Sequence, residues 1–147
     1  MSFFSSMNVS ASGMTAQRLR MDTISQNIAN VNTTRGENGG PYRRKTVVFE
    51  EIQSRNNFKG MLNEYLNEYS VNGGVKVSRI IEDNKPPIRA YDPSHPDADD
   101  EGYVSMPNVN TIEEMTNLIS ANRSYEANIT AFNASKSMIS SALNIGR

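Results

Sequence analysis

The sequence predicts an α+β fold in which long N- and C-terminal helices pair as a coiled coil and flank a small β-rich central domain. Three observations lead to this prediction. Apolar residues repeat at heptad spacing only near the two ends of the chain, short β-branched segments occupy the middle, and charged residues concentrate there as well. We therefore divide the chain into an N-terminal helix at 1–34, a charged β-rich domain with loops at 35–103, and a C-terminal helix at 104–147.

The N-terminal segment carries one heptad series of apolar residues. The series comprises Met7, Met14, Met21 and Ile28, with Phe3, Ile24 and Val31 at intervening positions. Two further intervening positions, Ser10 and Gln17, are polar, and Gly13 in the helix interior costs about 0.5–1 kcal/mol. Because an isolated helix of this composition is marginal, we expect it to need a partner.

The C-terminal segment carries a longer heptad series. Its positions alternate spacings of three and four at Met115, Leu118, Asn122, Tyr125, Ile129, Phe132, Lys136, Ile139 and Leu143. Asn110 or Thr111 supplies a start signal, and Glu113 and Glu114 fall in the first turn, where the helix dipole favours anions. We predict a helix at about 109–144. The apolar members of both series are the expected assembly seam.

The middle of the chain has shorter patterns. Segments rich in β-branched residues predict strands at 43–52, 75–82 and 102–106. Apolar residues within 58–69 follow the spacing of an amphipathic helix. The segment 82–102 contains four prolines, so we predict no regular structure there.

Charge is distributed unevenly along the chain. Residues 35–103 hold 22 charged side chains, whereas 1–34 hold three and 104–147 hold six. The outer helix positions carry mainly Ser, Thr, Asn and Ala instead of the Glu and Lys of a coiled coil that stands in water. Such small neutral side chains suit helices embedded in an assembly, with the charged middle facing solvent or neighbours. The alternative is a polar, poorly stable helix pair.

Composition excludes several kinds of site. The chain has no cysteine, so it forms no disulfide, thiolate zinc site or cysteine nucleophile. With His95 as its only histidine and no phosphate-binding loop, we expect no enzyme activity, no metal and no cofactor. The net charge of −1 gives no reason to expect nucleic acid, and no apolar run is long enough for direct membrane insertion.

Two charged motifs have alternative interpretations. Residues 97–102 imitate the first half of a calcium-binding EF-hand loop, but Asn108 stands in place of its final glutamate. A solvated or interface-forming acidic loop is therefore favoured. The basic run 43–45 is interpreted as a strand with exposed cations. The alternative is a contact with the acidic cluster 97–101 of a neighbouring subunit.

Four long segments match motifs of one protein family. SASGMTAQRLRMDTISQNIANVNTTR resembles the N-terminal signature shared by the rod, hook and hook-associated proteins of the bacterial flagellum. GGPYRRKTVVF, YDPSHPDADDEGYVSMPNVN and EMTNLISANRSYEANITAFNASKSM are similar to the proximal rod proteins of that family. The signature residues are Asn27, Ile28, Ala29, Asn30, Thr34, Pro107, Asn108, Tyr125 and Asn128.

This resemblance implies a structural subunit of the proximal rod, the drive shaft of the flagellar basal body, that serves bacterial motility. The implied partners are other flagellar rod proteins and copies of itself in a helical assembly, together with the flagellar type III export apparatus. The implied location is the rod that crosses the periplasm, reached without a cleaved signal peptide. In agreement, the first residues, MSFFSSMNVSASGM, lack the basic and apolar regions of such a signal.

A second hypothesis is a soluble coiled-coil adaptor or export chaperone. A chaperone is expected to be a stably helical dimer by itself. A rod subunit is expected to have frayed terminal helices that fold upon polymerisation. Circular dichroism with limited proteolysis of the purified monomer distinguishes the two.

Overall fold

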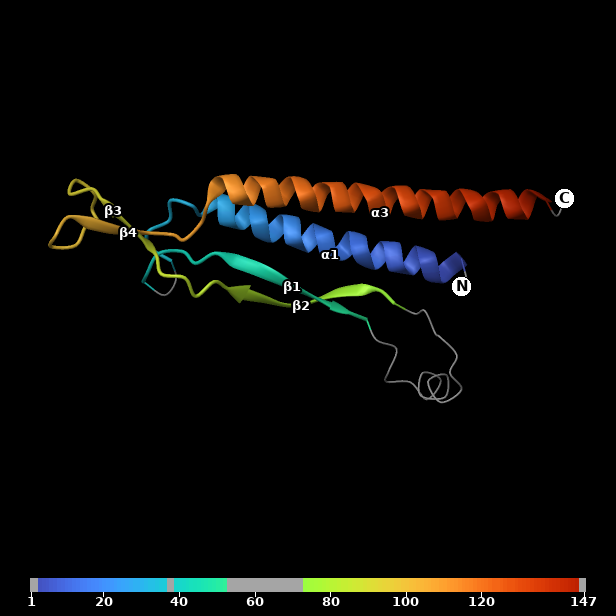
Figure 1. Ribbon diagram of the computed structural model, residues 1–147, viewed down its shortest axis with the longest axis horizontal. Helices are drawn as coiled ribbons and strands as arrows, with labels where there is room; N and C mark the ends of the chain where they lie inside the picture. The colour runs from blue at the N-terminus through green and yellow to red at the C-terminus, as the bar shows by residue number, and fades with distance from the viewer. Residues whose placement is uncertain (1–2, 37–38, 53–72, 146–147) are drawn as a thin grey trace, which may run out of the picture. The chain divides into compact units, whose positions relative to one another are not determined.

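The computed structural model describes residues 3–36, 39–52 and 73–145 (Figure 1). Its elements in chain order are helix α1 (Phe3–Ala29), strands β1 (Lys45–Glu51), β2 (Val75–Glu82), β3 (Ile88–Tyr91) and β4 (Tyr103–Met106), and helix α3 (Thr111–Ile145). The predicted combination of N- and C-terminal helices with a small central β region is confirmed. Their pairing as a coiled coil stays a prediction. The amphipathic helix predicted at 58–69 lies outside the described residues.

The chain divides into two compact units. Unit 1 combines Met1–Leu19, Phe49–Ser78 and Asn122–Arg147, and unit 2 combines Arg20–Val48 and Arg79–Ala121. Each unit therefore contains a part of both terminal helices and a part of the β region. The division into three consecutive segments at 1–34, 35–103 and 104–147 stays a prediction.

Side-chain and backbone hydrogen bonds define the ends of the helices in unit 2. At the start of α3, Asn110 Oδ1 accepts hydrogen bonds from the backbone N–H groups of Ile112 (3.1 Å) and Glu113 (3.4 Å), so of the two predicted start signals, Asn110 and Thr111, Asn110 is the cap. After the end of α1, both the backbone N–H of Asn30 (3.1 Å) and its side-chain Nδ2 (2.9 Å) donate to Gln26 O. Among the described helices, none combines the length and the apolar character needed to cross a membrane.

Strands β3 and β4 form an antiparallel pair in unit 2. The register pairs Ile88 with Met106, Arg89 with Ser105, Ala90 with Val104 and Tyr91 with Tyr103. The prediction of irregular structure throughout 82–102 is therefore wrong for residues 88–91. Pro87 and Pro93 flank β3 without interrupting it, so the residues between them keep the backbone N–H groups that a strand needs.

Strands β1 and β2 form a second two-stranded sheet. Backbone hydrogen bonds from Ile52 N to Gly74 O (2.7 Å) and from Asp83 N to Arg44 O (2.8 Å) join opposite ends of the two strands, so the strands run antiparallel. Most side chains of β2 are exposed. A two-stranded sheet is marginal alone, so this sheet depends on contacts with the helices.

The most buried helix positions are occupied mainly by small or polar residues. In unit 1 they are Ser10, Gly13 and Ala16 of α1 and Ser135 of α3, and in unit 2 they are Thr23, Ile24 and Asn27 of α1 and Glu114 and Ala121 of α3. Small side chains allow two helix backbones to approach closely. The helices are therefore held by close packing and hydrogen bonds more than by a layer of large apolar side chains.

Candidate functional site

The side chain of Asn27 lies at the centre of a buried hydrogen-bond network in unit 2. Its Nδ2 donates to Glu114 Oε2 (2.7 Å) and to the backbone oxygen of Lys45 (2.8 Å). Its Oδ1 accepts from the hydroxyl of Tyr42 (2.8 Å) and from the backbone N–H of Lys45 (2.9 Å). An asparagine amide has two donor hydrogens and two acceptor positions, so this side chain is fully satisfied. It joins the end of α1 to the start of β1 and to the first turn of α3.

A buried ion pair completes this network. The side chain of Glu114 is 1% exposed, and its Oε1 accepts hydrogen bonds from Nε (2.8 Å) and Nη2 (2.6 Å) of Arg44. Removing one partner of a buried pair typically costs about 3–5 kcal/mol because the remaining charge has no counterion. The sequence indicated a helix-dipole role for Glu114, and for Arg44 an exposed position or a contact with the acidic cluster 97–101 of a neighbouring subunit. The pairing of these two residues was therefore not predicted.

The phenol of Tyr42 belongs to the same network. Burial, followed by the nearby carboxylates of Glu82 and Glu114, raises the pKa of Tyr42 above its ordinary value. The hydroxyl therefore keeps its proton at neutral pH and remains the donor to Asn27 Oδ1. The ammonium of Lys45 lies 5.7 Å from the centre of the Tyr42 ring, within reach of a cation–π interaction.

The segment after α1 is tied down by side-chain hydrogen bonds. Thr33 Oγ1 donates to Asn30 Oδ1 (3.1 Å), and Thr34 Oγ1 donates to Asp97 Oδ2 (2.7 Å). Arg35 forms an ion pair with the same Asp97. The hydrogen bond from Thr34, and to a lesser extent the charge of Arg35, lowers the pKa of Asp97. Two signature residues, Asn30 and Thr34, thus fix the path from α1 towards the β region.

Two further signature residues support the start of β1. Asn108 Oδ1 accepts a hydrogen bond from the backbone N–H of Arg44 (3.0 Å), and Pro107 is fully buried. Ile28 is half-buried, whereas Ala29 is exposed. Unit 2 therefore brings together signature residues from the N-terminal and C-terminal parts of the sequence.

In unit 1, helices α1 and α3 meet through small residues. A Cβ atom added to Gly13 would lie 2.8 Å from Asn128 Oδ1, so a larger residue there would force the Asn128 side chain to move. Asn128 Nδ2 donates to the backbone oxygen of Ser124 (2.8 Å). The hydroxyls of Ser6 and Ser135 lie 3.4 Å apart. The signature residue Asn128 therefore occupies a gap that Gly13 provides.

The residues of the expected assembly seam differ in burial. Ile24 is buried, Met7, Met14, Met21, Ile28, Val31, Leu118, Tyr125, Phe132 and Ile139 are half-buried, and Met115, Ile129 and Leu143 are exposed. On α3, the half-buried seam residues alternate with Glu114, Ala121, Asn128 and Ser135, which lie one residue before the expected positions. The seam's role in assembly stays a prediction.

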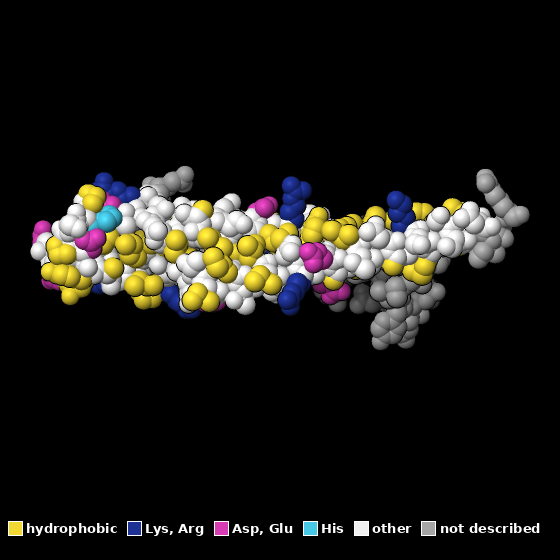
Figure 2. All heavy atoms as spheres, turned by 90° about the horizontal axis from the view of Figure 1, so that it is seen from above, with side chains coloured by type: hydrophobic (Ala, Val, Ile, Leu, Met, Phe, Trp, Pro, Cys, Tyr) yellow, Lys and Arg dark blue, Asp and Glu magenta, His cyan; other side chains and the backbone are white. Residues whose placement is uncertain are grey.

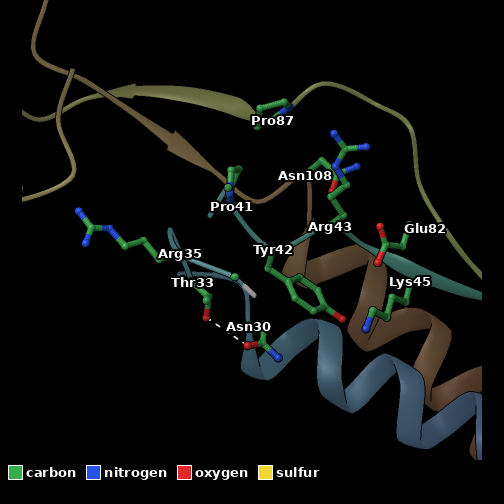
Figure 3. Close-up of a pocket in the computed structure, with 12 residues that line it drawn as sticks. Asn30, Thr33, Arg35, Pro41, Tyr42, Arg43, Lys45, Glu82, Pro87 and Asn108 are labelled. Atoms are coloured by element: carbon green, nitrogen blue, oxygen red, sulfur yellow. Dashed lines mark hydrogen bonds between the residues drawn. The ribbon is translucent and has the colours of Figure 1, made fainter. Parts of the chain in front are cut away.

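A cavity of about 690 Å³ lies in unit 2 beside the network (Figure 3). We call it the basic pocket. Its lining residues are Asn30, Thr33, Arg35, Gly36, Gly40, Pro41, Tyr42, Arg43, Lys45, Glu82, Pro87 and Asn108. Figure 3 shows Arg35 on the side opposite Lys45 and Glu82. Three cations against one anion give the lining a net positive charge.

The residues 97–101, which we call the acidic turn, are held by hydrogen bonds within the turn itself. Asp99 Oδ1 accepts from the backbone N–H groups of Glu101 (3.1 Å) and Tyr103 (2.8 Å). Asp99 and Asp97 are thus engaged in structural contacts. Across the described part of the chain, no group of three or more His, Cys, Asp or Glu side chains is arranged to hold a metal ion.

Comparisons with known proteins agree along the whole chain. Residues 7–35 match the family described as "Flagella basal body rod protein", and residues 100–145 match "Flagellar basal body rod FlgEFG protein C-terminal". The flagellar basal-body rod protein FlgC of Borreliella burgdorferi is 50% identical, with 99% of this chain and 98% of the relative covered. FlgC of Bacillus subtilis is 50% identical, with 100% of both chains covered. This chain belongs to the FlgC family of flagellar basal-body rod proteins.

More distant FlgC proteins extend the relationship. FlgC of Salmonella typhimurium is 37% identical, with 100% of both chains covered. Membership of the FlgC family makes this chain a structural subunit of the flagellar basal-body rod, as the sequence motifs predicted. The prediction that the chain is not an enzyme is confirmed as well, because FlgC proteins are structural rod proteins.

The two matched segments meet at the buried network. Asn27 lies within the matched residues 7–35, Glu114 lies within the matched residues 100–145, and a 2.7 Å hydrogen bond joins their side chains. The network therefore links the parts of the sequence by which FlgC and related rod proteins are recognised.

Proposed function

We propose that this chain is a subunit of the proximal rod and transmits torque as part of the flagellar drive shaft. It joins other rod proteins and copies of itself in a helical tube, and α1 and α3 make the contacts. It leaves the cytoplasm through the flagellar type III export apparatus without a cleaved signal peptide and takes its place in the part of the rod that crosses the periplasm. Full-length similarity to FlgC proteins supports this proposal.

We further propose that α1 and α3 pair as a coiled coil within each subunit. In unit 2, the hydrogen bond between Asn27 and Glu114 supports this pairing. In unit 1, the contact between Gly13 and Asn128 supports it as well. These contacts engage one side of α3 and leave its other side for neighbouring subunits.

The exposed apolar side of α3 is the observation that carries the assembly proposal. In unit 2, the exposed side chains are Ile112 (78%), Met115 (51%) and Ile119 (56%), and in unit 1 they are Ile129 and Leu143. On the face in Figure 2, hydrophobic side chains reach the surface along the helices, and charged side chains are few. Burying a large apolar side chain contributes about 1.5–3 kcal/mol relative to leaving it in water. Neighbouring rod subunits that cover this side would gain this stabilisation.

A charge on the apolar side of α3 tests the assembly proposal. Ile112→Asp is expected to leave the helicity and thermal stability of the purified chain unchanged, because the side chain is already exposed. In cells that lack the native chain, the same variant is expected to abolish rod assembly and swimming. The matched control is Ala127→Asp, which adds the same charge at an exposed position of α3 that lies off the line of Ile112 and Ile119. Normal swimming with Ile112→Asp would overturn the proposal.

The state of the free subunit tests the coupling between folding and assembly. We expect the purified chain in dilute solution to show less helicity than α1 and α3 account for, because the outer ends of both helices fray while their packed parts stay folded. A protease should cut these outer ends first. Both properties should disappear once the chain is part of a rod. A stably helical dimer would support the chaperone hypothesis instead.

A further inference from the structure

Unit 2 carries unpaired charges of both signs. Arg43 and Lys45 of the basic pocket make no ion pair with any described residue. Asp100 and Glu101 of the acidic turn likewise make none within the described ranges. Because the two sets are not joined to each other, the described part of the chain does not neutralise them.

The basic pocket has the charge to attract an acidic side chain. Its cations come from the segment after α1 and from the start of β1, and Gly40 and Pro41 lie in the same lining. Within that lining, Arg35 is already paired with Asp97, so Arg43 and Lys45 are the cations left for a ligand. The hydroxyl of Tyr42 points into the buried network and carries no charge. Among the described lining residues, Glu82 is the one anion and lies on the side of Lys45 (Figure 3), so the unpaired cations still outnumber it.

The acidic turn is a rigid ligand. The side chain of Asp99 binds two backbone N–H groups within the turn and its flank, and the turn's other end is held by Asp97, which binds Thr34. At the base of the turn, the rings of Tyr91 and Tyr103 pack edge to face, with centroids 5.3 Å apart. A preorganised turn loses little conformational entropy when it binds.

We propose that the acidic turn of one copy of this chain docks in the basic pocket of a second copy, with Asp100 and Glu101 facing Arg43 and Lys45. The opposite charges of the two surfaces support this assignment. The contact rests on the proposed function, since it is made between subunits of the rod. It adds a charged contact outside the terminal helices.

A second copy fits better than an unrelated partner because each copy supplies both halves of the contact. The pocket and the turn are different surfaces of unit 2, so the contact is heterologous. Heterologous contacts leave a free pocket on one copy and a free turn on the next, so they continue into rings or helical assemblies and do not stop at a dimer. The charged contact therefore matches the helical order expected of a rod.

Disulfide trapping in isolated basal bodies tests this contact. Cells make two differently tagged full-length versions of the chain, one with Gly40→Cys and one with Glu101→Cys. The native chain has no cysteine, so no other thiol of the chain competes. A Cβ atom at Gly40 meets no atom within 4 Å, and Glu101 is exposed. The matched control replaces Gly40→Cys by Arg123→Cys, at an exposed position of α3.

After mild oxidation, we expect the mixed dimer of Gly40→Cys and Glu101→Cys to exceed the control pair several-fold. Adding Arg43→Glu to the pocket copy should lower the yield by about two- to fivefold, the effect of one exposed ion pair. Adding Asp100→Lys to the other copy should then restore it. If Arg43 only stabilised the fold of its own copy, Asp100→Lys in the other copy would not restore the yield of the mixed dimer.

Three outcomes would overturn the contact, its occupant or the proposed function, respectively. If the variants enter basal bodies but the mixed dimer does not exceed the control, the contact is wrong and the proposed function stands. If Gly40→Cys links only to a protein other than this chain, the second copy is the wrong occupant. If the tagged native chain is absent from basal bodies, the proposed function itself is wrong.

Discussion

The buried network makes a sharp prediction for Asn27→Asp, which changes one atom of the side chain and adds a charge. In the native chain, Nδ2 lies 2.7 Å from Glu114 Oε2 and 2.8 Å from the backbone oxygen of Lys45. In the variant, an oxygen would face both of these acceptors, while the two hydrogen bonds to Oδ1 could remain. Two donor hydrogen bonds become repulsive contacts in a fully buried site. We expect the free energy of unfolding to fall by about 3–5 kcal/mol at neutral pH.

The pH dependence of the variant has a definite sign. Burial beside the carboxylate of Glu114 should raise the pKa of the introduced carboxyl group above its unfolded value of about 3.9. The folded variant then binds a proton that the unfolded chain releases, so its stability relative to the native chain falls as the pH rises above about 4. Urea unfolding followed by circular dichroism at pH 4 and pH 7 measures this difference.

Asn30→Asp is the matched control for this experiment. It introduces the same charge three residues later, where Asn30 is only half-buried and its amide donates to Gln26 O. A loss of less than about 1.5 kcal/mol is expected there, the value of one partly solvated hydrogen bond. The reasoning about the network is refuted if Asn27→Asp is no more destabilising than Asn30→Asp, or if its stability does not decline between pH 4 and pH 7.

Three further predictions concern contacts outside the network. Gly13→Ala should destabilise the native chain because its Cβ atom would clash with Asn128. In an Asn128→Ala background the same substitution should stabilise the chain by about 0.5–1 kcal/mol, because alanine has a better helix propensity than glycine. A double-mutant cycle of unfolding free energies measures both effects. Thr34→Val should raise the pKa of Asp97 towards its ordinary value in an NMR titration. In the native chain, the Asp97 carboxylate stabilises the fold at pH values above its ordinary pKa, and this stabilisation is lost as the pH falls through its lowered pKa. In the Thr34→Val variant this pH-dependent stabilisation should be smaller. Gly102→Ala should reduce the free energy of unfolding by about 1–2 kcal/mol, because the native φ of +80° lies in the left-handed region; an unchanged thermal midpoint would contradict this.

Helices and most strands could be predicted because their patterns are local. The heptad spacing and a start signal at Asn110 or Thr111 predicted α3 at about 109–144, and the structure has it at Thr111–Ile145. Three of the four strands in the described part of the chain were predicted from β-branched residues. Strand β3 was missed because the prolines around it suggested irregular structure, although none lies between Ile88 and Tyr91.

Neither the buried network nor the line of buried and half-buried residues on α3, which comprises Glu114, Ala121, Asn128 and Ser135, could be predicted from local patterns. Apolar periodicity predicts that Met115 and Ile129 lie in the contact between the helices. Helices that approach closely instead use small or hydrogen-bonded residues at the contact, such as Ala121 and Asn128. The pairing of Glu114 with Arg44 depends on residues 70 positions apart, which no local pattern connects. The family signature did include Asn27, and only the structure shows which groups it binds.

The central claim is that neighbouring rod subunits cover the exposed side of α3, and thiol labelling of an Ile119→Cys variant tests it most directly. The side chain of Ile119 is 56% exposed in the chain itself. The rate of maleimide labelling is therefore expected to be high in the purified subunit, low in intact basal bodies, and high again after the basal bodies are dissociated. Equal labelling rates in the free subunit and in the intact rod would contradict the claim.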